Sequence, residues 1–386
     1  MSFLGIGGLR RRTVSEKYLP PIDGIRFVLI IIVVLLHISN QCYSTIFARG
    51  FPSQFSVHPI YYLYMDVLAH ATRCVPFFFA VSGFILALPF ARHRLHNSRP
   101  VSLSFYFLRR LTRLEPPNIV ILTLRFVLMI TVAGAPFAYY FRHFIASVFY
   151  VHNVIYNAPS IINIPAWTLE IEIQFYCLVP LFAYYFSIRR PVLRKVLLLV
   201  FMALMGVIQL RYFSWYQRSG LSILYWVQYF LDGFLIADLF LTVWHRIPEH
   251  WLWEVLTLPI WAWTFLSNDP KFHAYMPFLL IPLFISAFKA PLQRRFLSTN
   301  IATVIGGMCY TLYITHNIVI SACAHFFRRA HYAPPLEVWL VTMAVVLAFG
   351  LVYFILIERP CMDPNWPKRL WRRFFPEAAA TTDPAV

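Results

Sequence analysis

Long apolar stretches recur along the chain from residue 25 to residue 357, and short segments that hold most of the charge separate them. A helix needs about 20 mostly apolar residues to cross a bilayer, because it rises ~1.5 Å per residue. The sequence is 60% hydrophobic and only 13% charged, whereas soluble domains are about 25% charged. These features exclude a soluble, disordered or disulfide-rich secreted protein. They predict an all-α, polytopic helical bundle in a membrane.

We predict about ten transmembrane helices. They cover residues 25–41, 60–90, 117–134, 164–187, 196–213, 222–243, 251–267, 274–289, 300–325 and 336–357. The apolar stretch 141–158 contains two histidines and two asparagines, so we predict a re-entrant or interfacial helix there. The expected domains are a basic N-terminal segment (1–24), a transmembrane domain (25–357) and a tail (358–386).

The distribution of positive charge predicts the orientation. Of the 33 Lys and Arg residues, 23 lie in segments that are cytoplasmic when both termini are inside, and 8 lie on the opposite side. Positively charged loops remain in the cytoplasm, so we expect both termini there and a multi-pass protein of the plasma (inner) membrane. Topology thus explains the formal net charge of +17. We expect contact with membrane lipids and no nucleic-acid partner.

The six cysteines are scattered and show no zinc-binding spacing, so we expect no metal. Ionisable residues inside apolar spans are better candidates for function, because each costs at least ~2.5–3.5 kcal/mol to insert. Arg26 and His37 lie eleven residues apart in the first span, which places them ~16 Å apart along one helix face. A lone histidine there is alternatively a hydrogen-bonded packing residue.

The fourth predicted span contains two carboxylates, Glu170 and Glu172. Two residues apart, they point ~200° away from each other on a helix. We therefore expect one to face a polar interior and the other to bond near the outer interface. A carboxylate beside a histidine can orient the ring and balance its charge during acid–base catalysis. A purely structural buried pair is the alternative.

Two further segments contain candidate polar groups. Ser82 precedes Gly83 after an aromatic stretch, which favours helix packing or a substrate hydrogen bond; no G-x-S-x-G pattern marks Ser82 as a nucleophile. Arg109, Arg110 and Arg113 cluster in the loop 91–116. Guanidinium groups bind phosphates in a fork geometry, but anchoring to anionic lipid headgroups needs only the positive charge.

Six segments, in this order, resemble motifs of the membrane-bound acyltransferase-3 family, whose members O-acylate sugars on polysaccharides, glycolipids and small natural products. The segments are 20–37, 76–86, 107–116, 165–180, 309–319 and 356–360. The departures from the family pattern are Ile173, where a second acidic residue is common, and Thr315, where an aromatic residue often precedes the histidine.

The resemblance implies roles for individual residues. It implies that His37 is the general base or acyl carrier, assisted by Glu172, and that Arg26, Arg110 and Arg113, with Arg109 beside them, bind the donor. Substrate-binding or structural positions of the family motifs are matched by Ser82, Trp167, Tyr310, His316, Glu358 and Arg359.

The implied reaction is transfer of an acyl group, usually acetyl, from cytoplasmic acyl-CoA to a hydroxyl group of a carbohydrate or glycolipid. The residues by themselves also fit a transporter or flippase of a lipid-linked or anionic substrate, or a non-catalytic scaffold. Release of free coenzyme A separates the enzyme from both alternatives.

Overall fold

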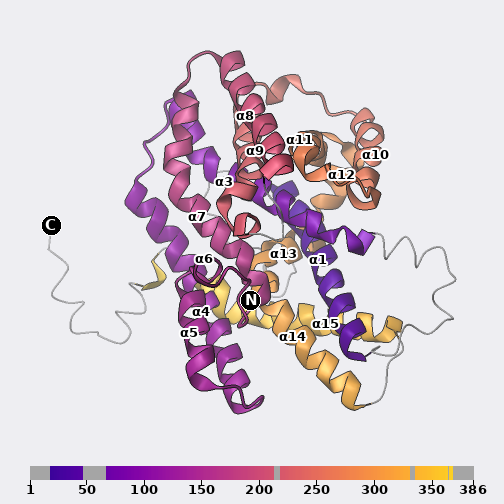
Figure 1. Cartoon of the computed structure of the whole chain (residues 1–386). Helices are drawn as coiled ribbons and strands as arrows, with labels where there is room; N and C mark the ends of the chain where they lie inside the picture. Colours follow the sequence, from indigo (N-terminus) through magenta and orange to yellow (C-terminus); the bar gives the residue numbers. More distant parts are fainter. Residues whose placement is uncertain (1–17, 47–66, 213–217, 331–334, 364, 368–386) are drawn as a thin grey trace, which may run out of the picture.

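The computed structural model describes residues 18–46, 67–212, 218–330, 335–363 and 365–367, and the regular structure in these ranges is helical (Figure 1). Most of the predicted N-terminal segment and tail, and residues 60–66 of the second predicted span, lie outside the described residues. The main helices are α1 (Pro20–Ile46), α3 (Cys74–His96), α4 (Leu103–Thr131), α5 (Phe137–Val148), α6 (His152–Tyr156), α7 (Trp167–Phe182), α8 (Pro191–Tyr212), α9 (Ile223–Thr242), α10 (Leu252–Leu266), α11 (Phe272–Lys289), α12 (Pro291–Leu297), α13 (Asn300–Gly307), α14 (Cys309–Arg329), α15 (Pro335–Tyr353) and α16 (Arg359–Cys361).

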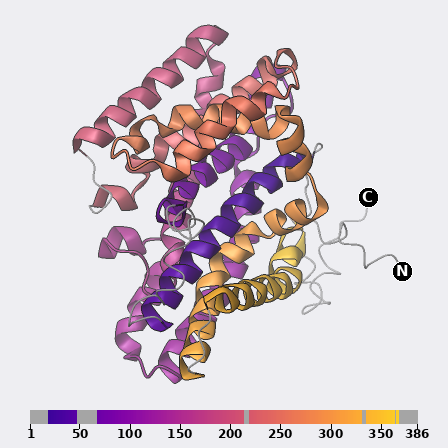
Figure 2. The ribbon, with the colours of Figure 1, turned by 90° about the vertical axis from the view of Figure 1, so that its right-hand side faces the viewer.

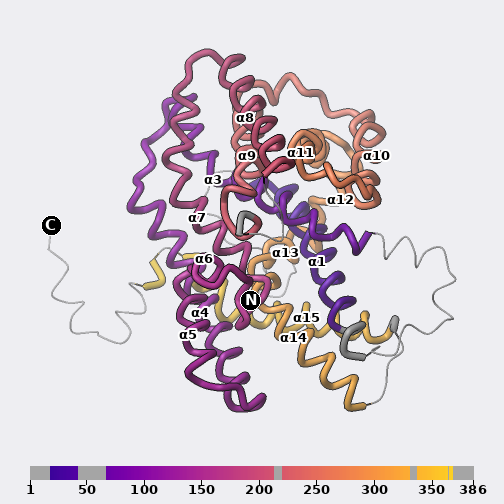
Figure 3. The backbone as a smooth tube through the Cα atoms, viewed as in Figure 1, coloured from indigo at the N-terminus to yellow at the C-terminus, as the bar shows by residue number. Residues whose placement is uncertain are grey.

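Seven helices of the described ranges are long and apolar enough to cross a membrane. The pair α13 and α14, bent by 70°, makes an eighth if it is counted as one span; the tube in Figure 3 follows this pair. The predicted all-α, polytopic bundle is therefore confirmed.

The number of spanning helices differs from the prediction. Each of the ten predicted spans contains a helix, but α7 and α10 have only 16 and 15 residues. They rise about 24 and 22 Å, less than the ~30 Å hydrocarbon layer. Short 3₁₀ turns, Ile164–Ala166 and Ala183–Ser187, continue α7 at both ends. Apolar length in the sequence thus overestimated the length of regular helix.

The structure also shows where α4 begins and which helices occupy the predicted re-entrant segment. Helix α4 begins at Leu103, well before the predicted residue 117, and the side chain of Ser102 caps it by accepting a hydrogen bond from the Phe105 amide. Helices α5 and α6 occupy the predicted re-entrant or interfacial segment. With 12 and 5 residues, neither is long enough to cross a bilayer.

Helix α1 runs through the middle of the bundle between two groups of helices (Figures 1 and 2). On one side it contacts α13, α14 and α15, and on the other it contacts α3. Helix α3 packs along α9, which also contacts α7, α8 and α11. Each group has its own apolar core, one rich in aromatic side chains around α3 and α9, the other between α1, α14 and α15.

Two glycines allow the backbones of α3 and α9 to touch. A Cβ on Gly83 would overlap the carbonyl group of Phe230, and a Cβ on Gly233 would overlap the backbone at Phe84. In lipid, where no hydrophobic force drives helices together, such close backbone packing is a main source of helix association. This contact sets where Ser82, the neighbour of Gly83, lies in the bundle.

We predict that Gly83→Ala and Gly233→Ala each destabilise the protein by about 1–3 kcal/mol, the usual cost of overpacking, because the neighbouring atoms are backbone. Thermal unfolding of the detergent-solubilised protein measures the effect. Gly350→Ala is the matched control, since the atoms it would meet belong to the flexible side chain of Leu312. Equal melting temperatures for all three variants would contradict this account of the α3–α9 contact.

Candidate active site

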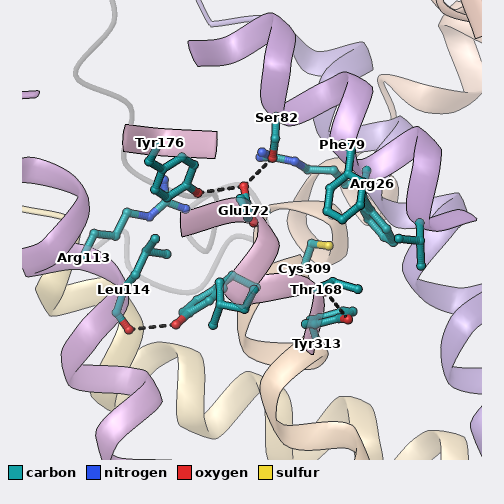
Figure 4. A pocket seen from close by; sticks show the side chains of 16 residues that line it. Arg26, Phe79, Ser82, Arg113, Leu114, Thr168, Glu172, Tyr176, Cys309 and Tyr313 are labelled. Carbon is teal, nitrogen blue, oxygen red and sulfur yellow. Dashed lines mark hydrogen bonds between the residues drawn. The ribbon is translucent and has the colours of Figure 1, made fainter. Parts of the chain in front are cut away.

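A cavity of about 130 Å³ lies inside the bundle, between α1, α3, α4, α7 and the α13–α14 bend (Figure 4). Its polar lining residues are Arg26, Ser82, Arg113, Thr168, Glu172, Tyr176, Tyr310 and Tyr313. We call it the inner cavity. Residues from five distant segments of the sequence therefore surround one small polar space.

Glu172 is the central acceptor of the inner cavity. Its Oε1 atom accepts hydrogen bonds from the Ser82 hydroxyl at 2.5 Å and from the Tyr176 hydroxyl at 2.7 Å. Arg26 and Arg113 point toward it from opposite sides (Figure 4). The two hydroxyl donors stabilise the ionised carboxylate and fix its orientation.

A second cavity, of about 660 Å³, adjoins the first and shares Arg113, Leu114 and Tyr176 with it. We call it the vestibule. Its cationic lining residues are Arg92, Arg99, Arg109, Arg110 and Arg113. The guanidinium carbon of Arg110 lies 4.3 Å from the ring centre of Tyr106 and 5.2 Å from that of Tyr176. Several fixed guanidinium groups around one space are suited to a ligand with more than one phosphate.

His37 and His316 form a pair between α1 and α14, with ring centres 5.0 Å apart. The Nδ1 atom of His316 is 2.9 Å from the Leu312 carbonyl oxygen. A carbonyl only accepts, so Nδ1 carries the hydrogen and Nε2 of neutral His316 has the lone pair. This Nε2 atom is buried and has no hydrogen-bond partner among the described residues. It can therefore accept a hydrogen bond.

The histidine pair lines neither cavity. Tyr313 connects the two places: it lines the inner cavity, and its ring centre is 6.0 Å from that of His316. Its hydroxyl donates to the Pro165 carbonyl oxygen at 2.7 Å and lies 2.5 Å from the Thr168 hydroxyl. The structure thus brings His37 to His316, while the hydrogen bonds of Glu172 go to Ser82 and Tyr176.

Glu358 stabilises the bend between α13 and α14. At the start of α14, the amide and hydroxyl groups of Thr311 donate to its Oε2 atom at 3.2 and 2.6 Å. Arg113 approaches its Oε1 atom to 3.5 Å. The first amides of a helix lack intrahelical acceptors and attract negative charge. Glu358 lies at the end of a π-helical turn. Its side chain therefore caps the N-terminus of α14.

The remaining residues that match family motifs join helices or begin them. The Tyr310 hydroxyl donates to the Leu114 carbonyl oxygen at 2.7 Å and so joins α14 to α4. Trp167 begins α7, with its ring 5.7 Å from Trp226, and Arg359 begins α16.

Glu170 accepts a hydrogen bond from the Asn153 amide at 2.8 Å, away from the cavity. The two glutamates thus point to different places, as their spacing predicts.

A second buried histidine pair lies outside both cavities. Nδ1 of His143 in α5 is 2.8 Å from Nε2 of His152 in α6, and Nδ1 of His152 donates to the Ala158 carbonyl oxygen at 3.0 Å. Burial lowers the pKa of both rings. A neutral pair can share one hydrogen in this arrangement, so the contact holds α5 against α6 without introducing charge.

Sequence reasoning missed several lining residues. Tyr176 lies four residues after Glu172 on the same helix face, so helical periodicity could have identified it. Arg92 and Arg99 lie within the basic loop 91–116, but no local pattern separates them from its other charges. Helices distant in the sequence bring them into the vestibule.

The family model described as an acyltransferase domain, that of the acyltransferase-3 family, matches residues 20–357. No curated protein and no solved structure matches the chain. The matched range includes α1 through α15, and with them both cavities and the histidine pair.

We predict that Glu358→Ala destabilises the protein by about 2–3 kcal/mol. It leaves Arg113 and the start of α14 without their acceptor, and the cost lies below the upper range for buried pairs because the Arg113 side chain is 33% exposed. Glu249→Ala is the matched control, since the ion pair of Glu249 with Arg294 is on the surface and contributes at most about 1 kcal/mol. Thermal unfolding distinguishes the two; a larger loss in Glu249→Ala would refute the capping role.

Proposed function

Because the chain belongs to the acyltransferase-3 family and is a membrane acyltransferase, we propose that it moves an acyl group, usually acetyl, from acyl-CoA to a hydroxyl group of a carbohydrate or glycolipid. One observation carries the proposal: the arginine-lined vestibule adjoins an inner cavity that contains Glu172 and ends at Tyr313, next to the histidine pair.

The vestibule is the proposed site of the coenzyme phosphates. Arg109, Arg110 and Arg113 supply guanidinium groups, and Arg92 and Arg99 add two more. Charge-assisted hydrogen bonds of this kind are roughly twice as strong as neutral ones. The buried ring of Tyr106 supports the guanidinium group of Arg110 and so positions it at this site.

The inner cavity is the proposed path of the pantetheine arm. Arg26 lies beside it, and His37 is about 16 Å further along α1 by helix rise, a length similar to that of the arm. The thioester can thus approach His37 while the phosphates remain in the vestibule. On the proposed path the arm passes Tyr313, which lines the inner cavity and lies next to His316.

The proposed chemistry is direct transfer. His37 takes the proton from the acceptor hydroxyl while the oxygen of that hydroxyl attacks the thioester carbon. The new C–O bond forms, the C–S bond breaks, and the leaving thiolate takes the proton from His37. His316, whose Nε2 has a free lone pair, can accept a hydrogen bond from protonated His37. Glu172, held by Ser82 and Tyr176, keeps the approach polar. The alternative route passes through an acyl-His37 intermediate.

We place the vestibule at the cytoplasmic face of the plasma (inner) membrane. The predicted positive-inside orientation supports this placement, because the loop 91–116 belongs to the cytoplasmic segments. Acyl-CoA would then bind from the compartment in which it is made.

We predict that Arg109→Ala/Arg110→Ala weakens acetyl-CoA binding at least about tenfold, since each lost hydrogen bond to a charged group is worth ~1.5–3 kcal/mol. This pair of changes leaves the Arg113–Glu358 contact in place. Titration calorimetry on the detergent-solubilised protein measures it. Arg189→Ala/Arg190→Ala removes the same charge from exposed residues that line neither cavity. Equal weakening in this control would mean that the vestibule does not bind the donor.

We predict that His37→Ala abolishes release of coenzyme A but leaves acetyl-CoA binding intact. His325→Ala, an exposed histidine of α14, is the control and should be fully active. Incubation of the wild type with labelled acetyl-CoA and no acceptor tests the route. Direct transfer leaves the protein unlabelled, whereas a stoichiometric, hydroxylamine-labile label that disappears in His37→Ala would establish the acyl-histidine route instead.

A further inference from the structure

Arg125 is a charged residue inside a membrane-spanning helix, and no carboxylate of the described residues forms an ion pair with it. It lies in α4. Its Nη1 atom donates to the Asn317 Oδ1 atom at 3.0 Å. An amide oxygen accepts a hydrogen bond but does not neutralise a guanidinium group, so the site retains a net positive charge where charge is expensive.

This charge lies directly beside the proposed reaction centre. Asn317, the hydrogen-bond partner of Arg125, directly follows His316 in α14. A line of hydrogen bonds continues from there: Ser321 donates to the Asn317 carbonyl oxygen at 2.8 Å, and Gln41 donates to Ser321 at 2.7 Å. Polar groups from three helices thus meet next to the histidine pair.

The polar line lies on the far side of the histidines from the donor. Arg125 is twelve residues beyond Arg113 along α4, or ~18 Å by helix rise. Gln41 is four residues beyond His37 on the same face of α1. The thioester reaches the histidines from the vestibule end, so a second substrate that approaches from the opposite end meets Arg125 and Asn317 first.

We propose that Arg125 and Asn317 bind an anionic oxygen group, a carboxylate or a phosphate, of the acceptor. This inference rests on the proposed function and names the class of acceptor: an acidic or phosphorylated saccharide. The guanidinium group keeps donors beyond Nη1 for a bidentate contact, and the Nδ2 amide of Asn317, whose Oδ1 already accepts from Arg125, is a further donor. The bound anion holds a neighbouring hydroxyl at His37 and His316.

The test measures binding of three sugars that differ in charge: glucose, glucuronate and glucose 1-phosphate. The full-length protein in detergent is titrated with each at constant ionic strength, and thermal stabilisation is recorded. We expect glucuronate, glucose 1-phosphate or both to bind at least about tenfold more tightly than glucose, as befits a hydrogen bond to a charged group. Arg125→Gln should remove this preference, and Arg125→Lys should retain part of it.

Two controls locate the binding. Arg109→Ala/Arg110→Ala should leave the preference unchanged; its loss there would place the anion in the vestibule and overturn the proposal. Arg142→Gln, at an exposed residue of α5, should also change nothing. A preference for neither anionic sugar, or one that survives in Arg125→Gln, overturns the proposal as well.

The binding assay needs no turnover, so it separates this inference from the proposed function. His37→Ala should still prefer the anionic sugars over glucose, because Arg125 and not His37 sets this preference. Arg125-dependent binding without acyl transfer to any acceptor would refute the proposed function only. Acyl transfer to charged and neutral sugars at equal rates, unaffected by Arg125→Gln, would refute the anionic acceptor only.

Discussion

The cost of an unbalanced charge in lipid governs where the ionisable side chains of this protein lie. Buried Asp238 of α9 forms ion pairs with Arg194 and Lys195 of α8. Arg73 donates to the carbonyl oxygens of Thr264 and Ser267, both at 2.7 Å. Such partners lower the cost and join helices. The guanidinium groups of the vestibule and of Arg125 are the charges that we propose a ligand balances.

The bend between α13 and α14 shows how the same constraint creates a site. An interrupted helix exposes backbone groups, and at membrane depth these are tolerated only where protein or a polar cavity satisfies them. Glu358 accepts from the start of α14, and Gly306 and Gly307 line the inner cavity. Gly306 also lies against the carbonyl group of Asp23, where a Cβ would overlap it. The break therefore brings α14 close to α1 and allows the two histidines to meet.

Fold class followed from apolar length, and the separate directions of Glu170 and Glu172 followed from helical periodicity. The sequence did not predict the tertiary partners of the site residues. The family resemblance implied that Glu172 assists His37, but nothing in the sequence indicated the ring contact of His37 with His316, 279 residues further along the chain. Local periodicity indicates which face of a helix a residue occupies, but not which distant helix packs there. Likewise, the length of an apolar stretch does not show where regular helix ends, as α7 and α10 illustrate.

The position of the histidine pair outside the cavities has a chemical consequence. A thioester beside an activated base in open water would be hydrolysed, and a transferase must suppress that reaction by excluding water. Tyr313 lines the inner cavity, and its ring centre is 6.0 Å from that of His316. Its hydroxyl group bonds to Pro165 and Thr168. Those two partners belong to the segment that begins α7, the helix of Glu172. Displacement of Tyr313 would thus disturb the segment that begins the helix of Glu172. In the proposed reaction, access to His37 and the geometry of the inner cavity would therefore depend on one set of contacts.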